Sequence, residues 1–348
     1  MKKLIALLMA AMMILGLAAC NDGTGSSPAA ANDASAPAQE SAAPADKDAG
    51  PVRIAFISPA MHYDFFAYLA AAAKKTAEEN GAQIDVFDAK EDFTQVAEFI
   101  SHAVAQKYDV ICTTGFEPII PAVAEANAAG IPLINFDARL MGPGDFYARV
   151  SSDNKELGKL DGEYVRGLIE QRTDKEHFVL MTVNFKDSQS NIDRCEGFAE
   201  AFAGMDNVEI KEVLPAAATV EGAQALFDDL LIGNPAGTID YIFASSAGTG
   251  VGTMAAVTTA GRSEIGVVAV DDEQGLLDAL LDPDSSFLAT AAQNPSDIGR
   301  MTVEAALKAV EGEESGEVVV PGRLITKENV QKDIEEQAAL KEELSKYK

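Results

Sequence analysis

The sequence lacks the residues and motifs on which most catalytic sites depend. Its 348 residues include no tryptophan and three histidines, His62, His102 and His177, which are far apart in the chain. It contains no Walker-type glycine loop, no Gly-x-Ser-x-Gly elbow and no Cys-x-x-Cys pair. These absences exclude the standard catalytic sets, so we expect no catalytic residue, no metal and no cofactor.

Basic residues and cysteines are also scarce. The chain has 27 Lys and Arg against 55 Asp and Glu, a formal net charge of −28. Such an acidic protein is repelled by a phosphate backbone, so no nucleic-acid partner is expected. Beyond Cys20 only Cys112 and Cys195 remain, and Cys112 lies in an apolar, strand-like run. A disulfide framework is therefore not predicted.

The longest apolar run is at the N-terminus. Lys2 and Lys3 precede the apolar residues 4–17, and the segment ends in Leu-Ala-Ala-Cys at Cys20. The run is shorter than the ~20 residues of a membrane span and has the order of a signal peptide. Residues 17–20 resemble the bacterial lipobox, which implies a signal peptide over 1–19 and a lipid on Cys20; an ordinary signal peptide is the alternative. Residues 20–50 are rich in small and polar residues and are expected to form a flexible tether.

Short apolar runs alternate with stretches of helical length after residue 52. The pairs are 52–57 with 65–80, 83–87 with 94–106, and 109–113 with 118–128. Further strand-like runs are 132–136, 241–244 and 266–270, with more between 179 and 213. This alternation predicts an α/β fold with parallel sheets, and the length of this part favours two lobes.

Polar and aromatic residues follow several of the predicted strands. His62, Tyr63, Phe65 and Phe66 follow the first, and residues 137–139, 245–246 and 271–272 follow others. Because ligands bind beyond the carboxyl ends of parallel strands, we expect these loops to converge on one cleft. A lone loop histidine such as His62 is more often simply exposed.

Several segments together resemble the type I periplasmic binding proteins, in particular the ribose- and galactose-binding branch. They include Ala-Gly-Ile-Pro-Leu-Ile-Asn-Phe-Asp at 129–137, Val-Ser-Ser-Asp-Asn at 150–154 with Gly158, Cys-Glu-Gly-Phe at 195–198, and Ala-Gln-Asn-Pro at 292–295. The resemblance covers residues 52 to about 326. It implies two Rossmann-like lobes with parallel sheets and a three-segment hinge: an N-terminal lobe of 51–152 plus 294–322, and a C-terminal lobe of 153–293 plus 323–348.

The resemblance also implies a sugar pocket. Phe65 and Phe66 would form one wall, since the apolar C–H face of a sugar packs on an aromatic ring. Core packing at the start of a helix is the alternative role of Phe65. Asp137 and Asp271 would accept hydrogen bonds from hydroxyl groups, and Gln293 corresponds to a hinge glutamine. Helix capping is the alternative role of Asp271. Arg139 lies one residue beyond the position where ribose-like members have an arginine.

Other positions depart from the family pattern and favour a ligand other than ribose. Ile192 stands where a binding arginine is usual, with Asn191 beside it and Asn184 upstream. Ser246 replaces an asparagine, and Tyr63 replaces a polar amide. Another pentose, a hexose, a deoxysugar, a polyol or a small signalling diol would suit these changes. Arg194 and Glu196 are interpreted as a structural ion pair or a solvated face. Residues 328–348 are expected to form a solvated amphipathic helix packed on one lobe, with a docking surface as the alternative.

The resemblance implies a monomeric receptor, not an enzyme, that closes on a small sugar or polyol. It would be held in the periplasm, or on the outer face of the cytoplasmic membrane, by the lipid on Cys20. It would present its ligand to an ABC permease in the membrane; delivery to a chemoreceptor or sensor kinase is an alternative. A hydrolase or isomerase with Asp137 and Asp271 as general acid and base is a remote alternative. A repressor is excluded by export, acidity and the missing helix-turn-helix.

Overall fold

The computed structural model describes residues 50–140, 144–313 and 316–348. The predicted signal peptide, the lipid site at Cys20 and nearly all of the predicted tether lie outside these residues. Within the described ranges, no helix has the length and apolar character needed to cross a membrane.

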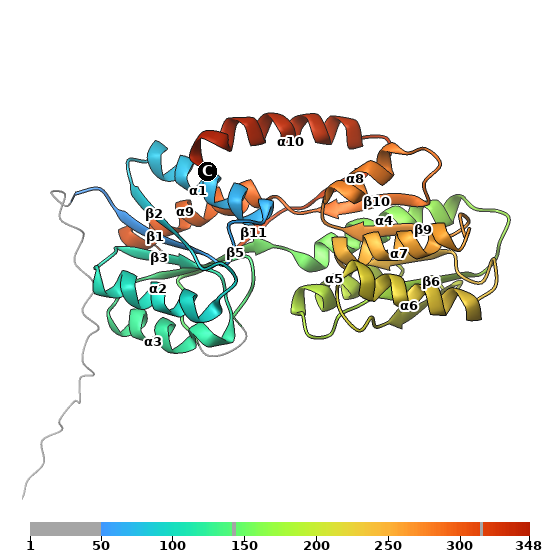
Figure 1. Cartoon of the computed structure of the whole chain (residues 1–348), viewed down its shortest axis with the longest axis horizontal. Helices are drawn as coiled ribbons and strands as arrows, with labels where there is room; N and C mark the ends of the chain where they lie inside the picture. Colours follow the sequence, from blue (N-terminus) through green and yellow to red (C-terminus); the bar gives the residue numbers. More distant parts are fainter. Residues whose placement is uncertain (1–49, 141–143, 314–315) are drawn as a thin grey trace, which may run out of the picture. The chain divides into compact units, whose positions relative to one another are not determined.

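The first sheet is six-stranded and parallel, in the order β11-β5-β4-β3-β1-β2 (Figure 1). We call this sheet and its helices the N-terminal lobe. Helices α1 and α9 pack on one face, around Phe56 and Phe136, and α2 and α3 pack on the other. The strands are β1 (Arg53–Ser58), β2 (Gln83–Asp88), β3 (Val110–Thr113), β4 (Leu133–Phe136), β5 (Ala148–Ser152) and β11 (Glu317–Val320). The helices are α1 (Asp64–Glu79), α2 (Phe93–Ala105), η1 (Glu117–Ile119), α3 (Ile120–Ala128) and α9 (Pro295–Glu311).

The second sheet also has six strands, in the order β12-β10-β9-β8-β6-β7, and we call it and its helices the C-terminal lobe. Helices α4 and α5 cover one face, and α6, α7 and α8 cover the other. The strands are β6 (Phe178–Val183), β7 (Val208–Val213), β8 (Tyr241–Ala244), β9 (Gly266–Val270), β10 (Phe287–Ala292) and β12 (Arg323–Thr326). The helices are α4 (Asn154–Gln171), α5 (Gln189–Glu200), α6 (Val220–Gly233), α7 (Ala247–Thr259) and α8 (Gln274–Leu281).

The predicted fold class is confirmed, with one exception: β12 runs antiparallel to β10. The chain passes between the sheets after β5, after β10 and after β11. Each of these strands ends at the edge where the chain leaves its sheet. β12 instead begins where the chain enters the second sheet, beside the end of β10, so it must run in the opposite direction.

Helices α4 and α5 pack so closely that glycine is needed at their contact. A Cβ on Gly158 would lie 1.8 Å from the carbonyl oxygen of Arg194, and a Cβ on Gly197 would lie 1.8 Å from that of Lys155. The backbones touch at both points because neither glycine has a side chain. Gly158 therefore fixes the position of the α5 turn that carries Arg194.

The C-terminal helix α10 (Val330–Leu344), followed by η2 (Ser345–Tyr347), contacts both lobes (Figure 1). Near its start, Asp333 accepts a hydrogen bond of 2.7 Å from Nε of Arg323. At its end, the buried Leu344 packs with Ala71 and Ala72 of α1. The expectation that this segment packs on one lobe is therefore wrong, because Leu344 is buried on the alanine-rich face of α1.

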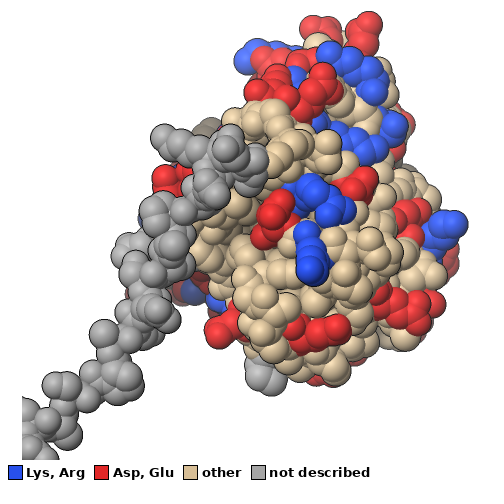
Figure 2. Space-filling view, turned by 90° about the vertical axis from the view of Figure 1, so that its left-hand side faces the viewer, with Lys and Arg blue, Asp and Glu red and all other residues tan. Residues whose placement is uncertain are grey.

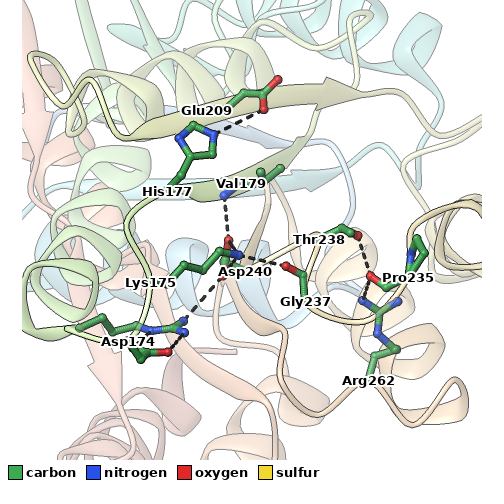
Figure 3. A network of polar contacts seen from close by, with 11 residues as sticks. Asp174, Lys175, His177, Val179, Glu209, Pro235, Gly237, Thr238, Asp240 and Arg262 are labelled. Atoms are coloured by element: carbon green, nitrogen blue, oxygen red, sulfur yellow. Dashed lines mark hydrogen bonds and ion pairs between the residues drawn. The ribbon is translucent and has the colours of Figure 1, made fainter.

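A buried carboxylate joins β6 to β8 at the amino ends of these strands (Figure 3). The side chain of Asp240 is 5% exposed, and its two oxygens each lie 2.8 Å from Nζ of Lys175. It also accepts a hydrogen bond of 2.8 Å from the backbone N–H of Val179. The positive charge of Lys175 thus compensates the charge of Asp240, and Asp240 provides a hydrogen-bond acceptor for an N–H group at the start of β6.

Both cysteines in the described part of the chain, Cys112 and Cys195, are buried and free. Burial raises the pKa of the Cys195 thiol to about 12, which keeps it protonated and unreactive. On the surface, Lys and Arg are interspersed with Asp and Glu on the face shown in Figure 2.

Candidate functional site

Asp137 and Asp271 occupy equivalent positions in the two sheets. Asp137 directly follows β4, with φ 57°, and Asp271 directly follows β9, with φ 84°. Their N–H groups donate to the carbonyls of Val150 and Ala291, each over 2.9 Å. A left-handed φ is uncommon for a residue other than glycine and is often found at functional sites. Helix α8 begins only at Gln274, and its N-cap is Glu273, so Asp271 does not cap it.

Arg194 joins these carboxylates, and its interpretation as a solvated or structural pair with Glu196 is wrong. Its side chain is 7% exposed, and Nη1 lies 3.4 Å from Oδ2 of Asp271. Nη1 also donates to the carbonyl oxygen of Ser245 over 2.9 Å, and Nε donates to Oδ1 of Asn154 over 2.8 Å. Glu196 instead lies near Lys155. The sequence signal was the Arg-Cys-Glu-Gly-Phe segment, whose Gly197 packs against the backbone of Lys155 on α4.

Gln293 lies where the chain leaves the C-terminal lobe and also contacts Asp271. Its Nε2 donates a hydrogen bond of 2.9 Å to Oδ1 of Asp271. Its carbonyl oxygen accepts a hydrogen bond from Arg323, which also contacts Asp272. Asp271 therefore receives Gln293 on one oxygen and Arg194 on the other.

The electrostatic environment differs between the carboxyl groups. Burial raises the pKa of Asp137 to about 6; the positive charge of Arg194 opposes this shift, and the negative charge of Asp271 adds to it. Because charges interact strongly in a protein interior, Asp137 of one lobe lies in the electrostatic field of Arg194 and Asp271 of the other lobe. Burial also raises the pKa of Asp161 on α4, which lies in the field of the same two residues.

The predicted aromatic residues lie at and around the start of α1. Phe65 and Phe66 are half-buried against the core of the N-terminal lobe, with ring centroids 5.1 Å apart in an edge-on arrangement. The Tyr63 side chain is exposed, and its hydroxyl donates over 2.6 Å to Oε1 of Glu91 on the next loop. His62 is exposed beside Tyr63, in ring contact with it.

The remaining predicted site residues are Asn191, Asn184, Ser246 and Arg139. Asn191 is buried on α5, three residues before Arg194 and so on the same helix face. Asn184 is buried after β6, and its Nδ2 donates over 2.7 Å to Glu212. Ser246 caps α7 together with Thr249. Arg139 is not brought to this group, because its exposed guanidinium pairs with Glu317 of β11.

Several buried polar atoms that lack a hydrogen-bond partner among the described residues lie at the carboxyl ends of the strands. A buried donor or acceptor left unpaired costs about 1–3 kcal/mol, so such a group marks a place where polar binding is favoured. Four of them are Oγ of Ser58 at the end of β1, Oγ1 of Thr114 after β3, Oδ1 of Asn184 after β6 and Oγ of Ser245 after β8. Others, such as Oδ1 of Asp161 on α4 and Oγ1 of Thr253 on α7, lie elsewhere. Ser245 belongs to a loop that was expected at the cleft, whereas Thr114 carries no sequence motif and was not predicted.

The arrangement suits recognition of hydroxyl groups. Carboxylate oxygens accept hydrogen bonds and a guanidinium donates them, and the charged partner strengthens each bond. Among the described residues, no group of three His, Cys, Asp or Glu side chains could hold a metal ion. Fold and site together define a two-lobed binding protein with polar groups from both lobes.

The family profile described as "Periplasmic binding protein domain" matches residues 54–314. The chain therefore belongs to the periplasmic binding protein family, and the predicted resemblance is confirmed.

The alignments with two curated relatives span most of the length of both chains. The chain is 27% identical over 262 residues to the ribose import binding protein RbsB of Salmonella typhimurium, covering 75% of this chain and 85% of the relative. It is also 27% identical over 245 residues to a D-apiose import binding protein of Actinobacillus succinogenes, covering 69% and 76%.

Solved structures share the fold. An ABC transporter solute binding protein of Agrobacterium vitis with bound allitol has a TM-score of 0.69 at 23% identity, covering 82% of this chain and 99% of that one. A Bacillus halodurans solute binding protein with bound myo-inositol has a TM-score of 0.69 at 22% identity, covering 83% and 99%. At these identities the likeness is one of fold.

Proposed function

We propose that this protein is the substrate-binding lipoprotein of an ABC importer and that it binds a small sugar or polyol between its two lobes. The observation that carries the proposal is the pair of carboxylates directly after β4 and β9, Asp137 of the N-terminal lobe and Asp271 of the C-terminal lobe, both with left-handed φ, with Nη1 of Arg194 3.4 Å from Asp271. A ligand whose hydroxyl groups bridge these residues favours closure of the hinge, because it contacts both lobes only when they are closed.

The relatives support a saccharide ligand and a transport role. Two of them are named for the import of ribose and of D-apiose. Phe65 and Phe66 would cover the apolar face of the sugar, while Gln293 holds Asp271 in position. Asn184, Asn191, Tyr63 and Ser246 remain candidates for contacts to hydroxyl groups. Arg139 is not included, since it pairs with Glu317.

The membrane location follows from the N-terminal sequence. A lipid on Cys20 would hold the monomeric protein at the outer face of a membrane, within reach of the permease that receives the ligand. Metabolic labelling with an alkyne fatty acid tests this point. We expect label on the wild-type protein and none on Cys20→Ser; an unlabelled wild-type protein would rule out the lipid anchor.

Thermal melting of the full-length protein, refolded to remove carried-over ligand, tests the ligand class. The panel contains pentoses, hexoses, deoxysugars, polyols and nucleosides. A ligand that binds the folded state raises Tm by mass action. At a ligand concentration a hundredfold above Kd, the free energy of unfolding rises by about 2.7 kcal/mol. We expect a shift with one sugar or polyol class and its loss in Asp271→Asn.

The matched control is Asp206→Asn, which changes an exposed aspartate of the same lobe. It should keep the shift. No shift with any sugar or polyol would contradict the proposal, and a shift with nucleosides alone would reassign the ligand.

A further inference from the structure

A pair of phenylalanines lies outside both the core and the proposed contacts. Phe93, the first residue of α2, and Phe116, just after β3, have ring centroids 4.0 Å apart at an interplanar angle of 39°. Phe93 remains 36% exposed. Among the described residues, neither ring belongs to a hydrophobic cluster of the two lobes. The two rings therefore pack on each other at the surface, where exposed apolar groups often mark a binding site.

The backbone places this pair beside the loop of Asp137. The N–H of Gly115 donates over 2.9 Å to the carbonyl oxygen of Ala138, the residue after Asp137. A Cβ on Gly115 would lie 2.2 Å from the backbone nitrogen of Leu140, so the two loops are in close contact. Phe116 follows Gly115 directly, so the backbone of the phenylalanine pair borders the loop that carries Asp137.

The loop before Phe93 is held in an unfavourable conformation. Lys90 and Glu91 both have left-handed φ values, 52° and 67°. The N–H of Glu91 donates over 2.7 Å to the carbonyl oxygen of Pro59, and its carboxylate accepts the bond from Tyr63. Each left-handed residue other than glycine costs about 1–3 kcal/mol and persists only where surrounding contacts enforce it. These contacts fix the loop that positions Phe93 at the start of α2.

We infer that Phe93 and Phe116 form a second subsite, which receives a flat ring attached to the sugar held at Asp137. The inference rests on the proposed function and specifies the ligand as a glycoside, a sugar joined to an aromatic ring. The sugar places its hydroxyl groups on Asp137 and Asp271. The attached ring packs on the exposed phenylalanine pair, a contact between apolar ring faces.

Calorimetric titration of the full-length protein with matched ligands tests the subsite. D-ribose, D-allose and D-galactose are each compared with their phenyl β-glycosides. Ring stacking of about 0.5–1.5 kcal/mol corresponds to a preference of about two- to tenfold for the glycoside. We expect this preference in the wild-type protein and its loss in Phe93→Ala, Phe93→Leu and Phe116→Ala, with the affinity for the free sugar unchanged.

The control variant is Ile232→Ala, which removes a side chain that is 85% exposed on α6 of the other lobe. It should keep the preference. Phe93→Leu retains an apolar side chain, so it separates loss of the ring from misfolding, which melting curves also report. Equal affinity for sugar and glycoside, a preference that survives in the phenylalanine variants, or binding of polyols alone would overturn the subsite and leave the proposed function standing. No binding of any sugar, glycoside or polyol would overturn both.

Discussion

Nη1 of Arg194 lies 3.4 Å from Oδ2 of Asp271, and the two side chains are 7% and 27% exposed. Arg194 comes from α5 and Asp271 from the end of β9, 77 residues apart in the chain. Together with the field that both exert on Asp137, this contact makes Arg194 the positive centre of the site. The site thus depends on a charge that is almost fully removed from water.

Replacement of Arg194 by methionine should destabilise the protein and abolish ligand binding. Removing one partner of a buried ion pair leaves an uncompensated charge and costs about 3–5 kcal/mol. Urea denaturation of the ligand-free protein measures the loss. The control is Arg139→Met, whose exposed pair with Glu317 should contribute about 0–1 kcal/mol. Equal losses in both variants would show that Arg194 has no special role.

Replacement of Asp137 by asparagine should flatten the dependence of stability on pH. The pKa of Asp137 is about 6 in the folded protein against an ordinary value of 3.8, so the folded state binds the proton more tightly. The contribution of this group is therefore greatest below about pH 4 and is lost as the pH rises through about 6.

This loss amounts to about 1–3 kcal/mol at pH 7, from 1.36 kcal/mol per unit of pKa. Asp137→Asn should therefore gain stability relative to wild type as the pH rises from 4 to 7, measured as ligand-free Tm. Asp206→Asn, at an exposed position, serves as the control. Parallel pH profiles of wild type and Asp137→Asn would contradict the raised pKa.

Replacement of Gly158 by alanine should weaken both folding and binding. The added Cβ would lie 1.8 Å from the carbonyl oxygen of Arg194, so α4 and α5 must separate. Overpacking of this kind costs about 1–3 kcal/mol, and the displaced Arg194 should lower ligand affinity. The matched control is Gly167→Ala in the same helix, where no heavy atom lies within 4 Å of the added Cβ. That change should stabilise the helix by about 0.5–1 kcal/mol; the same gain at Gly158 would contradict the close contact.

Replacement of Asp240 by asparagine should lower stability without changing ligand affinity. The variant loses the charge that compensates Lys175, a cost of about 3 kcal/mol for a buried pair. The network lies at the amino ends of β6 and β8, the sheet edge opposite the site. Urea denaturation and calorimetry measure the two effects separately. Glu170→Gln, in an exposed pair with Arg166, is the control, and a reduced ligand affinity in Asp240→Asn would refute the separation.

The strands and most helices could be predicted from the sequence because their signal is local. The strand predicted at 266–270 is β9, Gly266–Val270, and the helix predicted at 65–80 is α1, Asp64–Glu79. Buried parallel strands are continuous apolar runs, and the intervening helices have helical length and periodicity. The reversed direction of β12 was not predicted, because it depends on which edge of the sheet the chain enters.

The sequence by itself determined the order of strands and helices, the acidic charge and the presence of Asp137 and Asp271 directly after strands. Only the tertiary structure decided which side chains turn inward. Arg194 became part of the site and Arg139 did not, although both follow plausible motifs. The reason is packing: Gly158 lets α5 approach α4 and buries Arg194 beside Asp271, whereas Arg139 finds Glu317 of β11 at the surface. Such partners come together only through contacts between segments far apart in the chain.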